Sequence, residues 1–279
     1  MRPAIRIAGA AELAVMAEWA AQEGWNPGLA DTAAFLAADP EGFLLAEDTH
    51  GRPAACISAV RQGKGFGFIG FYIVRPDLRG QGLGMALWRH AMERLAGRVV
   101  GLDGVVARQA DYACSGFRTA WRNVRYAARP QAVGGGQGQV VPAASLPFEA
   151  LSALDASVLP APREDFLRVW LSTPGHRALA VMRDGVLAGF GVLRPSQDGA
   201  RIGPLTAADA PSARALFDAL IEGQPGPIFL DLPEPNAAAV AMAEAAGMQP
   251  VFETARMYVG QAPAIPLERA FGLASFELG

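Results

Sequence analysis

A glycine-rich turn between a strand-like run and a helix-like run constrains this chain more than any other feature. Residues 71–74 are aromatic or β-branched, and Pro76 stops the strand because proline cannot donate a hydrogen bond to a neighbouring strand. Residues 79–84 then read Arg-Gly-Gln-Gly-Leu-Gly. Apolar residues recur at helical spacing from the turn onward, at Leu83, Leu87, Ala91, Met92 and Leu95. The pattern predicts a strand, a tight turn and a helix start in close succession.

Such a helix start is a site for an anion, and the residues indicate phosphate. The first amides of a helix have no partner within it, and the helix dipole places partial positive charge there. Glycine lets the backbone approach the anion, and Arg79 adds a charge that pairs with phosphate oxygens. The turn is not a nucleotide P-loop, which needs Gly-Lys-Ser/Thr. It is not a dinucleotide fingerprint either, because Met85 stands where that motif needs glycine.

The spacing Arg79-x-x-Gly82-x-Gly84 after Val74-x-Pro76 resembles the coenzyme A pyrophosphate loop of the GCN5-related N-acetyltransferase (GNAT) family. The resemblance implies that the loop amides bind the pyrophosphate and that the preceding strand pairs with the pantetheine. One strand amide would then polarise the thioester carbonyl. The residues that it assigns to acetyl-CoA are Ile73, Val74, Arg79, Gly80, Gln81, Gly82, Leu83, Gly84 and Met85. The alternative is a glycine-rich connection without a ligand.

The composition excludes several other classes of protein. The chain has 279 residues and a net charge of −3, so no basic field favours nucleic acid or anionic lipid. Its two cysteines and three histidines form no metal-ligand spacing, which predicts no metal and a reducing compartment. No apolar run reaches the length of a membrane span, and residues 1–13 lack the apolar region of a signal peptide. We therefore expect a cytoplasmic protein; the sequence does not indicate its oligomeric state.

Periodicity predicts an α/β (α+β) chain whose first half has the element order of the GNAT fold. Strands are expected at 4–8, 42–47, 53–60, 66–74, 99–102 and 118–126. Helices are expected at 11–22 and 31–38, directly after the glycine turn, and at 109–115. Asp31 is expected to cap the second of them. The element order supports the resemblance independently of the loop.

A stretch rich in Pro, Gly and Gln at 129–138 predicts a linker between a GNAT domain at 1–128 and a second domain at 139–279. The second half repeats the plan, with strands at 139–141, 176–182, 186–193, 200–205, 228–230 and 251–259. Its helices are expected at 148–158, 162–171, 212–221 and 236–246. Each half is thus expected to hold a mixed, mostly antiparallel sheet flanked by helices, around a core of its own.

The chain as a whole resembles bacterial tandem-GNAT acetyltransferases, in which a divergent GNAT-like domain follows the domain that binds acetyl-CoA. The likeness covers nearly the whole sequence, and beyond the loop it rests on the motifs at 23–28, 102–105, 202–205, 256–258 and 271–279. The acceptor substrates of that group are poorly defined, so the resemblance names none.

Tyr112 is the candidate general acid. It stands in Tyr112-Ala113-Cys114-Ser115-Gly116-Phe117, which resembles the Tyr-x-x-x-Gly-Phe segment that places a tyrosine at the coenzyme sulfur in many GNAT enzymes. A phenol of pKa ~10 is protonated at neutral pH and can donate to a thiolate. The alternative role is an aromatic cover for the sheet.

The sequence leaves two roles open for each of the other candidate residues. Asp103 is the nearest candidate for the general base, although a turn-forming aspartate fits its context better. Trp25 and Asn26 lie where the family shapes the acceptor site, with core packing the alternative for Trp25. Gly67 and Gly70 indicate either a bulge that opens a slot beside the next strand or close packing against a neighbour.

The second half lacks this chemistry. Residues 204–211 contain neither arginine nor glycine, and Ala243 stands at the position that matches Tyr112. We therefore expect only the first half to bind coenzyme A. The second half would serve as scaffold or as one wall of the substrate cleft, or only for stability or dimer contact.

The expected function is an N-acetyltransferase that transfers the acetyl group of acetyl-CoA to an amine of a small molecule or protein, by direct attack in a ternary complex. A non-catalytic acyl-CoA sensor is the alternative, and transfer to a hydroxyl also stays open. Tyr112 favours the enzyme, because a sensor needs no acid at the sulfur.

Overall fold

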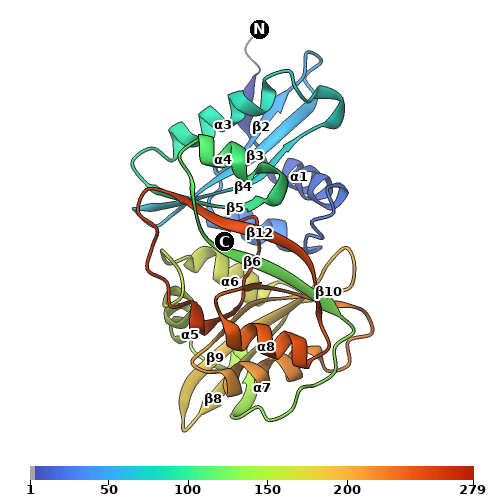
Figure 1. The fold of residues 1–279 in the computed structure, drawn as a ribbon, viewed down its shortest axis with the longest axis vertical. Coiled ribbons are helices and arrows are strands. Elements are labelled where there is room, and N and C mark those ends of the chain that lie inside the picture. Colours follow the sequence, from blue (N-terminus) through green and yellow to red (C-terminus); the bar gives the residue numbers. More distant parts are fainter. Residues whose placement is uncertain (1–3) are drawn as a thin grey trace.

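The computed structural model describes residues 4–279 and joins both halves of the chain through one mixed, mostly antiparallel sheet flanked by helices (Figure 1). The first half contains β1 (Ile5–Ile7), α1 (Ala10–Gln22), α2 (Asp31–Ala38), β2 (Phe43–Glu47), β3 (Pro53–Gln62), β4 (Phe66–Val74), α3 (Leu83–Arg94), β5 (Val99–Val105), α4 (Gln109–Cys114) and β6 (Arg118–Ala128). The second half contains β7 (Gln139–Pro142), α5 (Phe148–Ala156), α6 (Glu164–Ser172), β8 (Arg177–Arg183), β9 (Val186–Pro195), β10 (Ala200–Ala207), α7 (Ala210–Ile221), β11 (Ile228–Pro233), α8 (Ala237–Ala245), β12 (Gln249–Val259) and β13 (Ala270–Gly272). The elements expected from the sequence are confirmed to within a few residues, and β13 was not expected.

The two halves exchange their last long strands. The strand order is β1-β2-β3-β4-β5-β12-β6-β11-β10-β9-β8-β7, so β12 pairs with β5 and β6 pairs with β11. Figure 1 shows β12 and β6 running side by side through the middle of the molecule. Neither half therefore completes its sheet without a strand from the other.

A buried arginine–aspartate pair stands at each exchange, between residues directly opposite in register. Arg256 on β12 binds Asp103 on β5 through two hydrogen bonds of 2.8 Å. Arg125 on β6 binds Asp231 on β11 through bonds of 2.6 and 2.9 Å. All four side chains are at most 5% exposed. Bidentate pairs of this kind fix geometry as well as charge, so they specify the register of both exchanged strands.

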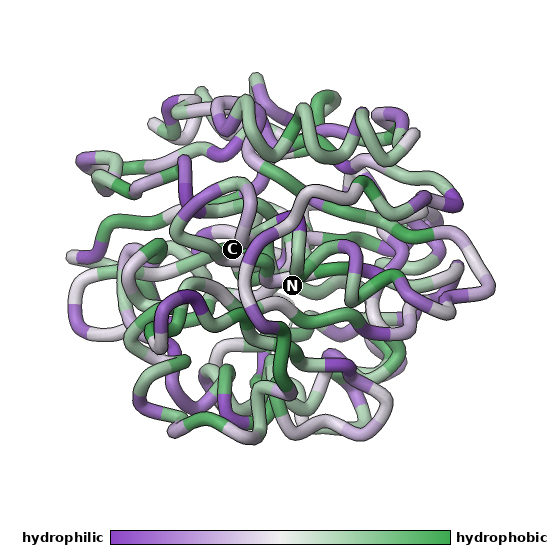
Figure 2. Tube along the Cα trace, turned by 90° about the horizontal axis from the view of Figure 1, so that it is seen from below, coloured by the Kyte–Doolittle hydropathy of each residue, from purple (hydrophilic) through white to green (hydrophobic). Residues whose placement is uncertain are grey.

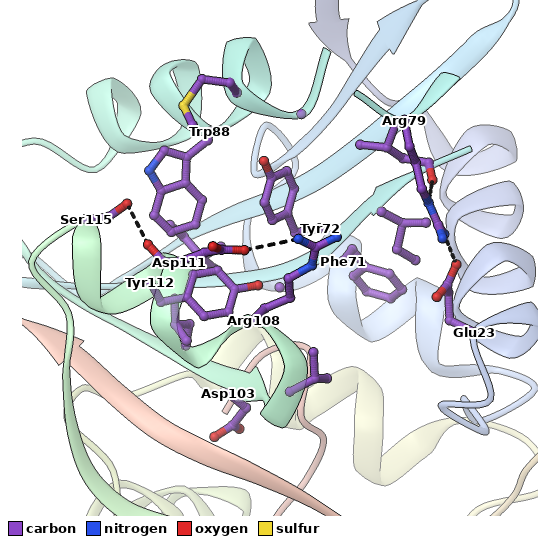
Figure 3. A pocket seen from close by; sticks show the side chains of 18 of the residues that line it. Glu23, Phe71, Tyr72, Arg79, Trp88, Asp103, Arg108, Asp111, Tyr112 and Ser115 are labelled. Carbon is purple, nitrogen blue, oxygen red and sulfur yellow. Dashed lines mark hydrogen bonds and ion pairs between the residues drawn. The ribbon is translucent and has the colours of Figure 1, made fainter. Parts of the chain in front are cut away.

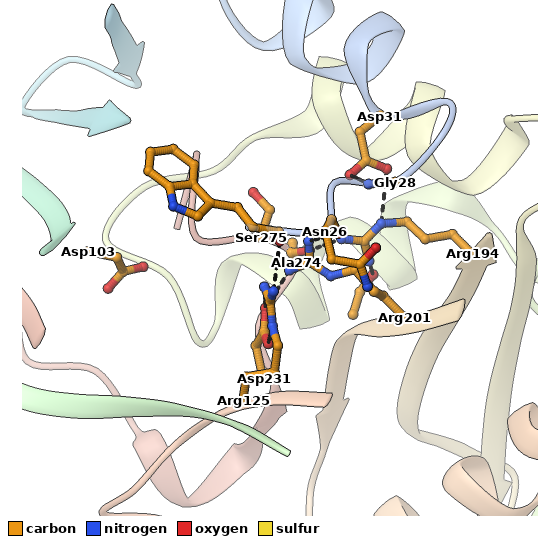
Figure 4. Close-up of polar contacts among 12 residues, drawn as sticks. Asn26, Gly28, Asp31, Asp103, Arg125, Arg194, Arg201, Asp231, Ala274 and Ser275 are labelled. Carbon is orange, nitrogen blue, oxygen red and sulfur yellow. Dashed lines mark hydrogen bonds and ion pairs between the residues drawn. The ribbon is translucent and has the colours of Figure 1, made fainter. Parts of the chain in front are cut away.

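Asp231 lies between two guanidinium groups, because Arg201 on β10 also binds it (Figure 4). Burial alone would raise the pKa of Asp231, but the charges of Arg125 and Arg201 outweigh it and hold that pKa at about 2. The carboxylate therefore stays ionised at neutral pH.

An apolar cluster also crosses the boundary between the halves. Phe35 on α2 stacks on Phe166 and Trp170 of α6, with ring centroids 6.4 and 6.2 Å apart. Figure 2 shows hydrophobic segments running through the interior while polar residues gather at the outer turns. Two further clusters lie mainly in one half each, so each half has the core expected of it, and this third cluster joins the two halves.

Asp31 differs from its expected role as a helix cap. It is the first residue of α2, and Ala30 occupies the capping position without a side-chain bond. The Asp31 carboxylate is buried, accepts from the amide of Gly28 at 3.0 Å and pairs with Arg194 of β9 at 2.9 Å. It links the halves instead of capping the helix.

Residues 270–279, here called the seam segment, run along the junction of the halves. β13 pairs antiparallel with β10. The chain then passes close to two glycines. A Cβ on Gly203 would lie 2.0 Å from the backbone oxygen of Leu273, and a Cβ on Gly70 would lie 2.1 Å from that of Glu277. Only glycine fits at these two crossings.

Within residues 4–279, no helix is both long and apolar enough to cross a membrane.

We expect Asp231→Asn to lower the free energy of unfolding by about 3–5 kcal/mol at pH 7, because it leaves Arg125 and Arg201 buried without their counter-charge. The native carboxylate has a pKa of about 2, below its unfolded value of about 3.9. The carboxylate therefore contributes to the free energy of unfolding above pH ~4, and this contribution is lost as the pH falls toward 2. Urea titrations at pH 7 and pH 3 should show that the difference in free energy of unfolding between variant and wild type is smaller at pH 3. Glu244→Gln, on the exposed last turn of α8, is the control; equal stability of both variants would contradict the role of the pair.

Candidate active site

A cavity of about 770 Å³ connects the glycine turn to the junction of the halves (Figure 3). The first half contributes β4, the turn, α3 and α4 to its walls. The second half contributes Phe252 and Thr254 from β12, and Phe276 and Glu277 from the seam segment. The strand exchange and the seam segment thus bring both halves to one site.

The glycine turn leaves its amides free for an anion. Gly80 and Gly82 have φ values of 77° and 84°, a left-handed conformation that only glycine adopts readily, and Gly82 is the N-cap of α3. No atom lies within 4 Å of a Cβ placed on either residue, so conformation rather than crowding requires glycine. Among residues 4–279, no acceptor binds the amides from Gly80 to Met85. These amides at the start of α3 are suited to bind phosphate oxygens.

Arg79 lies beside this turn but is engaged within the protein. Its Nε donates to the Val74 carbonyl at 3.0 Å, and its Nη2 pairs with Glu23 of the α1–α2 connection at 2.5 Å. The side chain is about half exposed. A phosphate bound at the turn would compete with Glu23, and this partner of Arg79 was not expected from the sequence.

A bulge in β4 opens the slot beside it. Pairing of β4 with β5 extends from Phe66 to Ile69 and stops where Phe71 takes a φ of 47°. Ile73 and Val74 then pair only with β3, so their other edge faces the cavity. The bulge expected from Gly70 is confirmed by the shift of register between Gly70 and Ile73. Close packing, the alternative role, also holds at Gly70 beside the Glu277 oxygen and is the role of Gly67, which lies in regular pairing and whose Cβ would meet Leu95 at 2.7 Å.

Tyr112 packs in an aromatic cluster and also reaches the cavity. Its ring centroid lies 5.5 Å from that of Trp88 and 6.5 Å from that of Phe117. Figure 3 shows its hydroxyl directed toward the middle of the site, where no residue of the described chain bonds to it. Burial raises the pKa of Tyr112 to about 12. The phenol therefore stays protonated and available as a donor.

Asp103 lines the cavity, and its carboxylate is bonded to residues of the neighbouring strands. It lies inside β5, so the prediction that it ends the strand in a turn is wrong. Besides its two bonds to Arg256, its carboxylate accepts from Asn123 at 2.7 Å. These three bonds tie the carboxylate to the strand junction, although burial raises its pKa against the opposing charge of Arg256.

Trp25 and Asn26 separate in space. Trp25 lines the cavity, and its carbonyl accepts from Arg125 at 2.7 Å. The Asn26 side chain turns away and exchanges hydrogen bonds of 2.8 and 3.1 Å with the backbone of Asp198. The structure does not bring Asn26 to the cavity; it docks the α1–α2 connection on the second half.

In the second half, the positions that match the glycine turn and the open slot are occupied by the protein's own residues. The carboxylate of Asp209 caps α7 by accepting from the Ser212 amide at 2.9 Å, and Pro211 carries no amide hydrogen. A negative charge thus occupies the position where the first half keeps free amides. β13 lies beside β10 where the first half has its open slot. Ala243 is buried and offers no hydroxyl.

Two residues that line the cavity carry buried polar groups without partners, and the sequence analysis assigned a role to neither. The carboxylate of Glu277 and the hydroxyl of Thr254 are buried, and no described residue bonds to them. Burial raises the pKa of Glu277 against the opposing charges of Arg201 and Arg125. Glu277 stands in the 271–279 motif, but neither that motif nor any pattern around Thr254 indicates a buried polar group, because burial here depends on contacts made far along the chain.

Comparisons with known proteins agree with this architecture. Residues 11–114 match the model of the acetyltransferase (GNAT) family, and residues 151–272 match an acetyltransferase (GNAT) domain model. The chain is 31% identical to the holothin acyltransferase of Pseudoalteromonas sp. (strain SANK 73390), over 96% of this chain and 92% of that protein.

Two solved structures share the fold. A putative acetyltransferase from Pyrococcus horikoshii has a TM-score of 0.84 at 20% identity, over 100% of this chain and 96% of that one. A tandem GNAT protein from the clavulanic acid biosynthesis pathway has a TM-score of 0.62 at 17% identity, over 93% and 99% of the chains. With two family matches along one chain and a full-length acyltransferase relative, the protein belongs to the GNAT acyltransferases and carries two GNAT domains.

Proposed function

We propose that the protein is an N-acetyltransferase that transfers the acetyl group of acetyl-CoA to a primary amine by direct attack in a ternary complex. The observation that carries the proposal is one cavity that joins free amides at a helix start, an open strand edge and a free phenol. The acyltransferase relative supports acyl transfer in general. The unbonded hydroxyl of Tyr112 favours an enzyme over a binding module.

In this proposal each part has one task. The amides of Gly80 to Met85 bind the pyrophosphate, with Arg79 exchanging Glu23 for a phosphate oxygen. The free edge at Ile73 and Val74 pairs with the pantetheine, and one of these amides stabilises the oxyanion that forms on the thioester carbonyl. Tyr112 donates its proton to the departing sulfur. Positioning of both reactants supplies much of the remaining rate enhancement.

We expect Gly82→Asp to weaken coenzyme A binding about tenfold or more, which corresponds to about 1.4 kcal/mol. The variant places a negative charge beside the pyrophosphate and strains the left-handed backbone. Gly97→Asp is a matched control, because Gly97 has a φ of 79° and open space around it but lies in the α3–β5 turn, outside the cavity. Titration calorimetry with coenzyme A should separate the two. Equal affinities would refute the assignment of the turn to the coenzyme.

Tyr112→Phe should lower turnover about 100-fold while changing the Kd of coenzyme A less than about twofold, because only the leaving thiolate needs the hydroxyl. Thiol release in the presence of an amine panel measures turnover. Tyr126→Phe is the control, since Tyr126 on β6 lies outside the cavity. Unaltered turnover in Tyr112→Phe would remove this residue from the mechanism. Absence of thiol release by the wild type, with intact coenzyme binding, would favour a sensor instead.

A further inference from the structure

We propose that the hydroxyl of Tyr72 donates a hydrogen bond to the coenzyme phosphate nearest the pantetheine, and so completes the anion site at the start of α3. This inference rests on the coenzyme site of the proposed function and adds a side chain to it. It also gives the two free phenols of the cavity different roles. Tyr72 binds the donor, whereas Tyr112 protonates the departing sulfur.

The first observation is the place of the Tyr72 hydroxyl. A Cβ on Gly84 would lie 2.8 Å from this oxygen, so the hydroxyl lies beside the first turn of α3. Figure 3 shows it directed toward that helix. The amides from Gly80 to Met85, which no acceptor binds among residues 4–279, lead into the same turn. A phosphate bound to those amides would therefore lie within reach of the hydroxyl.

The second observation is that this hydroxyl is free and open to the cavity. Tyr72 lines the cavity and is partly exposed, and no described residue bonds to its hydroxyl. The unbonded hydroxyls of Thr254 and Tyr258 are sealed from solvent, whereas that of Tyr72 is not. Burial of the ring raises the pKa of Tyr72, so the phenol stays protonated at neutral pH. It can therefore donate to a phosphate oxygen, and a bond to a charged acceptor is stronger than one to a neutral acceptor.

The third observation is that packing holds the ring in place. Tyr72 and Val74 pack against the cluster formed with α3, and the Tyr72 ring centroid lies 5.6 Å from that of Trp88 on this helix. Phe71 and Ile73 belong to a different cluster, on the side of α1 and α2. The edge proposed for the pantetheine begins at Ile73, directly after Tyr72. One coenzyme can therefore contact the strand edge, the Tyr72 hydroxyl and the amides of the turn.

The charged groups around Tyr72 are also compatible with an anion. Arg108 and Asp111 act on Tyr72 and pair with each other at 3.1 Å, with side chains that are 62% and 66% exposed. Arg108 lines the same cavity and makes no other hydrogen bond within the described chain. It can turn from Asp111 to a bound phosphate without leaving a buried charge unpaired. Arg79 and Arg108 thus give the cavity two guanidinium groups that exposed partners hold.

Tyr72→Phe tests the hydroxyl alone, because the ring keeps its packing on Trp88. We expect the Kd of coenzyme A in titration calorimetry to rise about tenfold, since a hydrogen bond to a charged group is lost. The kcat at saturating donor should change less than about twofold, because the hydroxyl does not touch the thioester. Tyr112→Phe should show the opposite pattern, and Tyr126→Phe, outside the cavity, should change neither quantity.

The phosphate is tested with two fragments of the coenzyme, 4′-phosphopantetheine and pantetheine, of which only the first carries a phosphate. The Kd of 4′-phosphopantetheine should rise about tenfold in Tyr72→Phe. That of pantetheine should stay within about twofold of the wild-type value. Quenching of tryptophan fluorescence reports binding, because Trp88 lines the cavity. An equal loss of affinity for both fragments would place the hydroxyl at the pantetheine and overturn the assignment to phosphate.

Gly84→Ala is an independent test of where the hydroxyl lies. The new methyl would lie 2.8 Å from the Tyr72 hydroxyl but 3.4 Å from the ring carbon that bears it, so it displaces the hydroxyl and tolerates a phenylalanine. We expect Gly84→Ala to weaken coenzyme A binding about tenfold in the wild type and less than about threefold in Tyr72→Phe. Additive effects of the two substitutions would contradict the position of the hydroxyl at this turn.

An unchanged Kd of coenzyme A in Tyr72→Phe would overturn this assignment and leave the proposed function standing. A wild type that does not bind coenzyme A would overturn both. A wild type that binds coenzyme A but acetylates no amine would overturn the proposed function alone, because the binding measurements need no turnover.

Discussion

The reciprocal pairs Arg256–Asp103 and Arg125–Asp231 are the interaction on which the site depends. Each joins a strand of one half to the last long strand of the other, with the partners directly opposite in register. A slip of one residue would turn every side chain of the strand to the opposite face of the sheet. Thr254 reaches the cavity from β12 only in the observed register. We interpret the buried pairs as devices for register more than for stability, since desolvation offsets much of their attraction.

The two halves begin from the same geometry and use it differently. In each, a parallel strand pair separates at a glycine, Gly70 in the first half and Gly203 in the second, and the seam segment crosses both. The second half fills the opening beside β10 with β13 and places the carboxylate of Asp209 at the helix start. The first half leaves the opening and the amides free. The same plan thus gives an open half and a closed half, and the difference lies in a few local contacts.

The sequence predicted what depends on neighbours along the chain. The glycine turn, the start of α3 and the bulge at Gly70 follow from steric rules that act over a few residues. It did not predict the strand exchange, because periodicity shows which residues face a core and not which strand lies alongside. Asp31 resembles a helix cap in sequence, yet its partner is Arg194, far along the chain. Glu277 belongs to the 271–279 motif, but its burial was not predicted for the same reason: it is set by contacts with the other half.

The arrangement divides the work of acyl transfer between the halves. Residues that would hold the donor, from Ile73 to Met85, all belong to the first half and depend on backbone geometry. The walls that the second half contributes come from β12 and the seam segment, where Phe252 and Phe276 present side chains. The proposed donor site and these walls share a cavity but not a segment of chain, so a side chain of the second half can be replaced without altering the backbone from Ile73 to Met85.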